Sequence, residues 1–195
     1  MVALVVLLAA AALTASAACG AENPGTEPGV RATEPTPFES CPAGANVVPS
    51  GKPAGAPMIP AVTLPCFTGG QSVALARLGR PAVINLWASW CPPCRAELPE
   101  FQRFADAAGD GLIVLGVVTG DTRSAAAAVA KDTGITFPAV FDADESLRRG
   151  LGRAGLPITI FVDASGRVRH VYQASELLTQ STLETLSREH LGVVV

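Results

Sequence analysis

The chain has 195 residues, and 49% of them are apolar, which is enough for one domain with a substantial core plus a tail. Its 14 basic and 17 acidic side chains leave a formal net charge of only -3 and are interspersed along the sequence. This balance gives no electrostatic footprint for nucleic acid or for an anionic membrane surface, so we expect no nucleic-acid partner.

Residues 1–18 carry no charged side chain and end in Ser-Ala-Ala, directly before Cys19. A short apolar run followed by small residues is typical of an export signal, so we expect residues 1–18 to be a signal peptide and the folded part to be extracytoplasmic. Small residues before a cysteine also resemble the lipobox of bacterial lipoproteins, and that resemblance implies a lipidated Cys19. An uncleaved signal is the alternative anchor, although about 20 apolar residues are needed to span a membrane.

Residues 19–57 are rich in Pro, Gly, Ala, Thr and Glu, and they show little apolar periodicity. We predict a flexible tether here, followed by the folded domain in residues 58–195. The five cysteines then divide into one for lipid, two for a structural bridge and two for catalysis, as suits an oxidising compartment. A Cys41–Cys66 disulfide would stabilise the domain by about 3 kcal/mol in the chain-entropy model. Two free thiols are the alternative.

The middle of the chain alternates between strand and helix patterns. Residues 83–86 and 112–118 are continuous apolar runs, which predict buried strands. Residues 94–107 and 123–132 predict helices, and Gly134 ends the second of them. Continuous apolar strands in such a βαβα unit are typical of a parallel sheet that is covered on both faces.

The last part of the sequence predicts a hairpin between two helices. Residues 144–149 predict a short helix. Residues 158–162 and 167–172 then predict two strands that are joined by a turn with glycine at its end. Residues 181–184 read Ser-Thr-Leu-Glu, a capping-box signature that predicts the start of a terminal helix at Ser181.

The strongest chemical signal is a pair of cysteines, Cys91 and Cys94, at the step from the 83–86 strand into the next helix. Two intervening residues let the sulfurs form a disulfide without backbone movement, and a helix N-terminus directs N–H groups and a partial positive charge at the first sulfur. We therefore expect Cys91 to be the attacking thiolate. Cys94, which is less accessible, would resolve the mixed disulfide with a partner protein.

Half of a zinc site is the alternative interpretation of this pair, because C-x-x-C also supplies metal ligands. A closed site needs two further ligands, and the chain has only two histidines, His170 and His190. The strand before the motif and the helix after it favour redox chemistry, so we expect no bound metal and no other cofactor.

Two longer motifs carry a family resemblance. Residues 90–99 read Trp-Cys-Pro-Pro-Cys-Arg-Ala-Glu-Leu-Pro, and residues 155–163 read Gly-Leu-Pro-Ile-Thr-Ile-Phe-Val-Asp. With these motifs, residues 58–192 resemble the TlpA/ResA-type extracytoplasmic thioredoxins. The resemblance implies an α/β thioredoxin-like fold with a mixed central sheet and helices on both faces. It also implies a cis Pro157 against the catalytic disulfide, with the Leu156 backbone pairing with an extended substrate.

Glu97 is predicted to assist the second thiol. It follows Cys94 by three positions on one helical face, so its carboxylate can reach back and take the thiol proton. The family resemblance implies the same role. Position 85, where cytoplasmic thioredoxins carry a buried Asp, is Asn85 and cannot exchange a proton. The alternative is a Glu that only interacts favourably with the helix dipole.

The motif residues around the thiols predict substrate binding and a redox direction. Trp90 is expected at the apolar rim of the substrate groove, and Trp87 in the core. Pro92 and Pro93 have no backbone N–H that could stabilise a Cys91 thiolate. A protein whose reduced form is less stable is a weaker oxidant, so the two prolines favour a reductase.

We therefore expect a monomeric protein-disulfide reductase that acts on exported cysteine-containing proteins and takes its electrons from a membrane thiol carrier. The family resemblance further implies a service to cytochrome c maturation. A disulfide-forming oxidant of the same fold is the alternative. A copper-binding assembly factor is a further alternative, although the related copper-binding proteins have three residues between their cysteines. The sequence shows no Thr-x-x-Cys context of a peroxidase.

Overall fold

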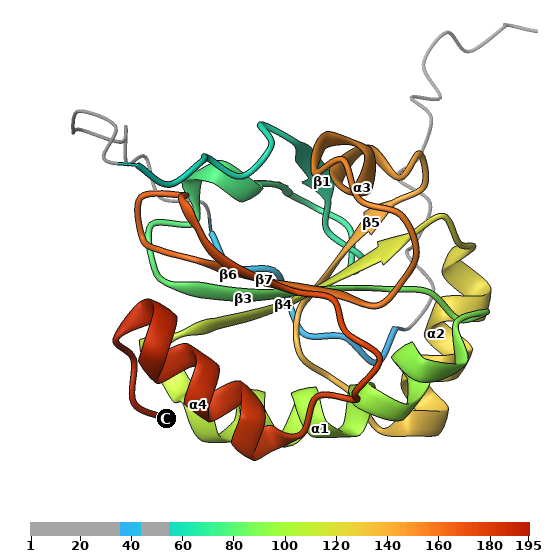
Figure 1. Ribbon diagram of the computed structural model, residues 1–195. Helices are drawn as coiled ribbons and strands as arrows, with labels where there is room; N and C mark the ends of the chain where they lie inside the picture. Colours follow the sequence, from blue (N-terminus) through green and yellow to red (C-terminus); the bar gives the residue numbers. More distant parts are fainter. Residues whose placement is uncertain (1–35, 44–54) are drawn as a thin grey trace, which may run out of the picture. The chain divides into compact units, whose positions relative to one another are not determined.

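The computed structural model describes residues 36–43 and 55–195 (Figure 1), so the predicted signal peptide and Cys19 lie outside the described residues. Its centre is a five-stranded sheet in the order β5-β4-β3-β6-β7. The strands are β3 (Ala82–Trp87), β4 (Ile113–Thr119), β5 (Ala139–Asp142), β6 (Ile158–Val162) and β7 (Val168–Tyr172). β3, β4 and β5 are parallel to one another. β6 runs antiparallel to both of its neighbours, β3 and β7. The mixed sheet of a thioredoxin-like fold is thus confirmed.

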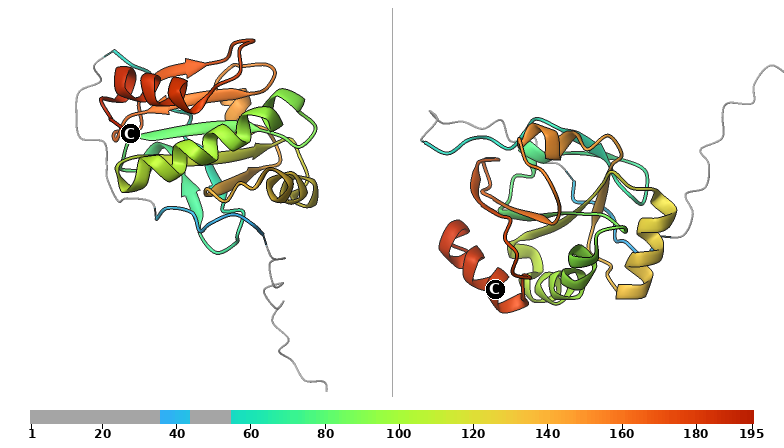
Figure 2. Two further views of the ribbon diagram at one scale, coloured as in Figure 1. Left: turned by 90° about the horizontal axis from the view of Figure 1, so that it is seen from below. Right: turned by 45° about the vertical axis from the view of Figure 1, so that its right-hand side comes forward.

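Helices cover both faces of this sheet, as the sequence predicted (Figures 1 and 2). One face carries α1 (Pro92–Ala108), α2 (Arg123–Thr133) and α4 (Gln180–Leu191), and the other carries α3 (Ser146–Gly150). β3, β4 and β5 follow one another in a single direction across the sheet, so two right-handed crossovers place α1 and α2 on the same face. Smaller elements are β1 (Thr63–Pro65), β2 (Ser72–Ala74), η1 (Leu75–Arg77) and η2 (Gly109–Gly111).

The core has two parts because strand β3 is buried on both faces. Val83 and Trp87 pack into a cluster with α1, α2 and α4, while Ile84 and Leu86 pack into a second cluster with α3 and β1. Alternate residues of a strand point to opposite faces, so Asn85 lies on the α1 face. The continuous apolar run therefore reflects a central strand without a solvated side.

The predicted hairpin is present between β6 and β7 and turns at Gly166. This glycine has φ +82°, and its N–H donates to the Asp163 carbonyl at 2.9 Å. A Cβ atom here would lie 2.5 Å from the carbonyl oxygen of Ala76. Glycine is required at this position both by the backbone conformation and by this close approach.

The predicted start of the terminal helix was wrong. α4 begins at Gln180 with Thr179 as its N-cap, and the Thr179 hydroxyl accepts the N–H of Thr182 at 3.3 Å. The N–H of Gln180 donates to the Glu100 carboxylate of α1 at 2.9 Å. A partner from another helix therefore fixes the helix start before Ser181, which a local capping pattern does not reveal.

Part of the range predicted as a tether packs onto the domain. Residues 36–43, here called the N-terminal strap, place the buried Phe38 ring 4.7 Å from that of Phe67 and 6.4 Å from that of Trp87. The strap backbone also donates from Glu39 to the Thr136 carbonyl at 2.7 Å. The packed domain thus includes residues that precede the predicted boundary at 58.

Candidate active site

One edge of the sheet gathers the loops that carry the predicted site. The carboxyl ends of β3, β4 and β7 and the amino end of β6 meet there, because β6 runs antiparallel to its neighbours. The loops at this edge include 88–91, 120–122, 155–157 and 173–179. Sequence segments that are more than 80 residues apart thus meet around the thiol pair.

Cys91 and Cys94 lie at the amino end of α1 and are joined by a disulfide with an S–S distance of 2.03 Å. Cys91 is the N-cap of the helix, and its sulfur accepts the N–H of Cys94 at 3.3 Å. α1 begins at Pro92, two residues before the predicted start, because prolines suit the first turn, where their missing N–H groups have no intrahelical partner. The sulfur that was expected to attack is therefore the one at the positive end of the helix dipole.

Both cysteines are buried in this disulfide form. Cys91 is 4% exposed and Cys94 is 1% exposed, and both pack within the core cluster on the α1 face. The order of exposure follows the expectation, but an openly exposed Cys91 is not observed. The cause is the packing of the Cys91 side chain into the core while its neighbours Pro92 and Pro93 point to solvent.

The loop before Cys91 is held by the loop that follows β4. The indole N–H of Trp90 donates to the Gly120 carbonyl at 2.9 Å, although the side chain is 59% exposed. The Asp121 carboxylate accepts the backbone N–H of Ser89 at 2.5 Å and its hydroxyl at 2.9 Å. Sequence reasoning missed Asp121. Its signal was a Gly-Asp pair directly after β4, at the edge where a parallel sheet places its sites.

The second motif places Leu156 and Pro157 at the same edge of the sheet. Their peptide bond is cis, and β6 begins at the next residue, Ile158, beside β3. Leu156 is half-buried and packs against both core clusters, including the one that contains the thiol pair. The Leu156 backbone is thus close to the strand that leads into Cys91.

Glu97 is a buried carboxyl group beneath the loop that precedes α4. It is 2% exposed, and one carboxylate oxygen accepts the N–H of Leu178 at 2.9 Å. The other oxygen, Oε2, has no hydrogen-bond partner among the described residues. Burial raises the pKa of Glu97 from 4.5 to about 6, while the hydrogen bond from Leu178 acts in the opposite direction. This carboxyl group can change its protonation state near neutral pH.

Asn85 is a second buried polar side chain on the α1 face. Its amide nitrogen donates to the Thr159 hydroxyl of β6 at 3.3 Å, and its carbonyl oxygen has no partner among the described residues. Asparagine cannot exchange a proton, so this position offers no base for the thiols. Glu97, in the helix that carries the thiols, is a buried carboxyl group that can titrate.

The structure also pairs Cys41 of the N-terminal strap with Cys66, at an S–S distance of 2.01 Å. Cys66 forms an isolated bridge with Val140 of the edge strand β5, and the Cys41 carbonyl accepts the side-chain N–H of Gln71 at 2.9 Å. This disulfide therefore joins the strap to the side of the sheet that ends in β5.

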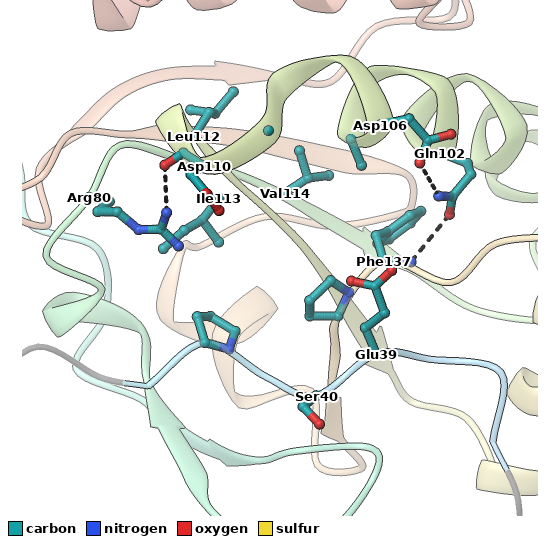
Figure 3. Close-up of a pocket in the computed structure, with 14 residues that line it drawn as sticks. Glu39, Ser40, Arg80, Gln102, Asp106, Asp110, Leu112, Ile113, Val114 and Phe137 are labelled. Atoms are coloured by element: carbon teal, nitrogen blue, oxygen red, sulfur yellow. Dashed lines mark hydrogen bonds between the residues drawn. The ribbon is translucent and has the colours of Figure 1, made fainter.

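Two hollows on the surface differ in their relation to the thiols. One of about 490 Å³ is lined by Trp90, Asp121, the loop residues 143–145 and Arg149 of α3. The other, of about 330 Å³, lies between the strap and the carboxyl-terminal half of α1, where the amide of Gln102 donates to Asp106 (Figure 3). The second hollow is lined by the first residues of β4, so it lies at the opposite edge of the sheet from the thiols.

Within residues 36–43 and 55–195, no cluster of three or more His, Cys, Asp or Glu side chains could hold a metal ion. In the same part of the chain, no helix has both the length and the apolar character needed to cross a membrane.

Comparisons with known proteins found a matching family model and several similar proteins. The family model described as Redoxin matches residues 53–186. The thiol:disulfide interchange protein DsbE of Pseudomonas fluorescens biotype C is 34% identical over 63% of this chain, and the match spans 65% of that protein. DsbE of Yersinia pestis is 32% identical over 73% of this chain and 74% of its own length. The crystal structure of a DsbF homologue from Corynebacterium diphtheriae is 27% identical, with a TM-score of 0.56, over 66% of this chain and 83% of that one.

Proposed function

This chain belongs to the redoxin family, and on that premise we propose that it is an extracytoplasmic thiol–disulfide oxidoreductase that acts on exported cysteine-containing proteins. The observation that carries the proposal is the Cys91–Cys94 disulfide at the amino end of α1, with the Cys94 N–H directed at the Cys91 sulfur. Two relatives that are named thiol:disulfide interchange proteins support the same chemistry.

The reaction passes two electrons to the client protein in two exchange steps. The Cys91 thiolate attacks one sulfur of a client disulfide, so a mixed disulfide forms and the other client sulfur leaves as a thiolate. Cys94 then gives its proton to Glu97 and attacks the Cys91 sulfur, which releases the second client thiolate and leaves the Cys91–Cys94 disulfide. The raised pKa of Glu97, about 6, suits a group that accepts and returns a proton near neutral pH.

The reductase direction is supported by the composition of the first helical turn. Pro92 and Pro93 have no backbone N–H, so the donor that reaches the Cys91 sulfur in this turn is that of Cys94. Fewer donors stabilise a thiolate less, and a less stable reduced form is a weaker oxidant. We propose that a membrane thiol carrier returns the protein to its reduced form, and that its clients include the haem-binding cysteines of apocytochromes.

The proposed extracytoplasmic location rests on residues 1–18 and Cys19. The apolar run of residues 1–18 directs export, and lipidation of Cys19 holds the domain on the outer side of a membrane. The Cys41–Cys66 disulfide supports an oxidising compartment, because structural disulfides persist where thiols are not kept reduced.

The redox potential of the Cys91–Cys94 pair tests the function and its direction together. Equilibration with glutathione should give a potential close to that of thioredoxin, about -270 mV, and the reduced protein should reduce insulin. A potential near that of the strong oxidant DsbA, about -120 mV, would contradict the direction. Efficient oxidative refolding of a reduced test protein would then establish the alternative, a disulfide-forming oxidant.

A further inference from the structure

The loop after β4, residues 120–122, is held in place by its own neighbours. The N–H of Gly120 donates to the Asp142 carbonyl at the end of β5, at 3.1 Å. Thr122 is the N-cap of α2, and its hydroxyl accepts an N–H of that helix at 3.3 Å. Asp121 therefore projects from a loop that two strands and a helix fix in position.

The Asp121 carboxylate uses both of its oxygens as acceptors. One accepts the backbone N–H of Ser89 at 2.5 Å, and the other accepts the Ser89 hydroxyl at 2.9 Å and the N–H of Thr122 at 2.7 Å. Hydrogen bonds to an ionised acceptor are stronger than those between neutral groups. The carboxylate thus joins the fixed loop after β4 to the loop that leads into the thiol pair.

That second loop is a single turn between β3 and α1. The N–H of Cys91 donates to the Ala88 carbonyl at 3.1 Å, which closes the turn. Its two central residues are Ser89 and Trp90, and both are bonded to the loop 120–122. A turn that is held at both central residues leaves Cys91 little freedom to move.

The end of this turn sets where the Cys91 sulfur lies relative to α1. The sulfur accepts the N–H of Cys94 at 3.3 Å, and the Cys91 carbonyl accepts the N–H of Arg95 at 3.2 Å. The effect of a helix dipole falls off within one turn, so a displaced sulfur gains less stabilisation as a thiolate. Alignment matters as well, because a misplacement of about 1 Å can slow a reaction about a hundredfold.

The charge of Asp121 acts in the opposite sense to its hydrogen bonds. A nearby carboxylate disfavours a thiolate, so loss of the charge alone would favour ionisation of Cys91. Loss of the hydrogen bonds to Ser89 would instead free the turn and disfavour this ionisation. The two effects differ in sign and can therefore be separated by experiment.

We propose that Asp121 is a positioning residue for the exchange reaction, and that by binding Ser89 it holds the Cys91 sulfur at the amino end of α1, where the thiolate is stabilised and aligned for attack. The inference rests on the proposed function and adds to it a residue that acts through Ser89 on the attacking thiol. Glu97 serves the second thiol from within α1, whereas Asp121 serves the first from the loop after β4.

The test is the pH dependence of Cys91 alkylation by iodoacetamide in the reduced protein, followed by mass spectrometry. Asp121→Ala should raise the pH midpoint by about half a unit, because the sulfur is less firmly held at the helix end. It should also slow the attack on 2-hydroxyethyl disulfide about tenfold. Asp121→Asn keeps an acceptor for the Ser89 N–H but carries no charge. Its midpoint should lie at or below that of the wild type, and its exchange rate should recover.

Two further variants serve as controls. Asp144 is an exposed carboxylate that lines the same hollow as Asp121, so Asp144→Ala is the matched loss of charge. It should keep the wild-type midpoint and exchange rate. Ser89→Ala loses the hydroxyl bond but keeps the backbone N–H bond, so it should raise the midpoint less than Asp121→Ala does.

Three results would overturn the inference and leave the proposed function intact. These are a midpoint in Asp121→Ala that is unchanged or lowered, a failure of Asp121→Asn to restore midpoint and rate, and equal shifts in Asp121→Ala and Asp144→Ala. If Asp121→Ala does not fold, Ser89→Ala decides, since a raised midpoint supports the inference and an unchanged one overturns it. A wild-type protein whose Cys91 is alkylated but exchanges with no disulfide would instead overturn the proposed function.

Discussion

The two disulfides of this chain differ in what brings their cysteines together. Cys91 and Cys94 are 3 residues apart, and the first turn of one helix places their Cα atoms 5.3 Å apart. Cys41 and Cys66 are 25 residues apart, and the strap must pack onto the domain before they meet at 5.9 Å. Since all four side chains are buried, burial does not distinguish a catalytic pair from a structural one.

Local surroundings make the distinction instead. A helix N–H is directed at the Cys91 sulfur, and the residues on either side of this cysteine are exposed. Opening this disulfide leaves the sheet and the strap in place. Opening the Cys41–Cys66 disulfide removes the covalent link between the strap and the domain. The first pair is therefore suited to repeated exchange, and the second to stability.

The largest effect should come from serine substitutions in the thiol pair. Cys94→Ser should reduce turnover to background and accumulate a mixed disulfide between Cys91 and the client, because the resolving thiol is missing. Cys91→Ser should be equally inactive but trap little. Non-reducing gels and mass spectrometry of the trapped species measure both results. Trapped clients attached to Cys41 or Cys66 would contradict the division between the two disulfides.

Removal of the other disulfide should lower stability and spare the chemistry. The Cys41→Ala, Cys66→Ala double variant should lose about 3 kcal/mol of unfolding free energy, because the unfolded chain is no longer closed into a loop. Urea unfolding measures this loss, and insulin reduction measured well below the unfolding midpoint should match the wild type. An unchanged midpoint, or inactivity of the folded variant, would show that the two disulfides are not independent.

Phe38 packs between the residue after Cys66 and the strand that leads into Cys91, so it tests whether the surroundings of the two disulfides are independent. It packs against Phe67, next to Cys66, and against Trp87 at the end of β3. Phe38→Ala should cost about 3 kcal/mol of unfolding free energy, and Phe38→Leu about 1 kcal/mol, because a smaller side chain leaves a cavity. In the variant that lacks the Cys41–Cys66 disulfide, the cost should be smaller, since the strap is then less firmly held. Equal costs in both backgrounds would mean that Phe38 acts independently of the disulfide.

Glu97 lies in the helix that carries the thiol pair and should affect rate more than stability. The release of client from the mixed disulfide should accelerate as pH rises through about 6, when the carboxylate becomes able to accept the Cys94 proton. Glu97→Gln should remove this dependence and slow release about a hundredfold. Stopped-flow measurements between pH 5 and 8 would show it. The same profile in Glu97→Gln and the wild type would exclude Glu97 as the base.

The pKa of Glu97 also predicts a small effect on stability with a defined sign. The pKa is about 6 in the folded protein, above its usual 4.5, so ionisation is less favourable in the folded state than in the unfolded one. Unfolding free energy should therefore fall by up to about 2 kcal/mol as pH rises from 4.5 to 6. Glu97→Gln should lack this decrease, whereas Asp106→Asn, at the far end of α1, should keep it. Denaturant unfolding across this pH range checks the sign.

Several features of the fold could be predicted because their signals are local. The runs 83–86 and 112–118 predicted buried strands since nearly every residue in them is apolar, and the cysteine spacing predicted a thiol pair on a helix. Other features depend on distant contacts. Phe38 lies in a segment without apolar periodicity, and only its packing against Phe67 and Trp87 reveals that the strap belongs to the domain.

The candidate site shows the same division between local and distant signals. By itself the sequence determined the thiol pair, its place between a strand and a helix, and the Pro157 motif, because each depends on neighbouring residues. Only the tertiary structure decided that Asp121 holds the loop before Cys91 and that Glu97 and Glu100 bond the segment before α4. Those hydrogen bonds join residues that are 32 to 81 positions apart, and no local pattern encodes which distant backbone N–H a buried carboxylate will accept.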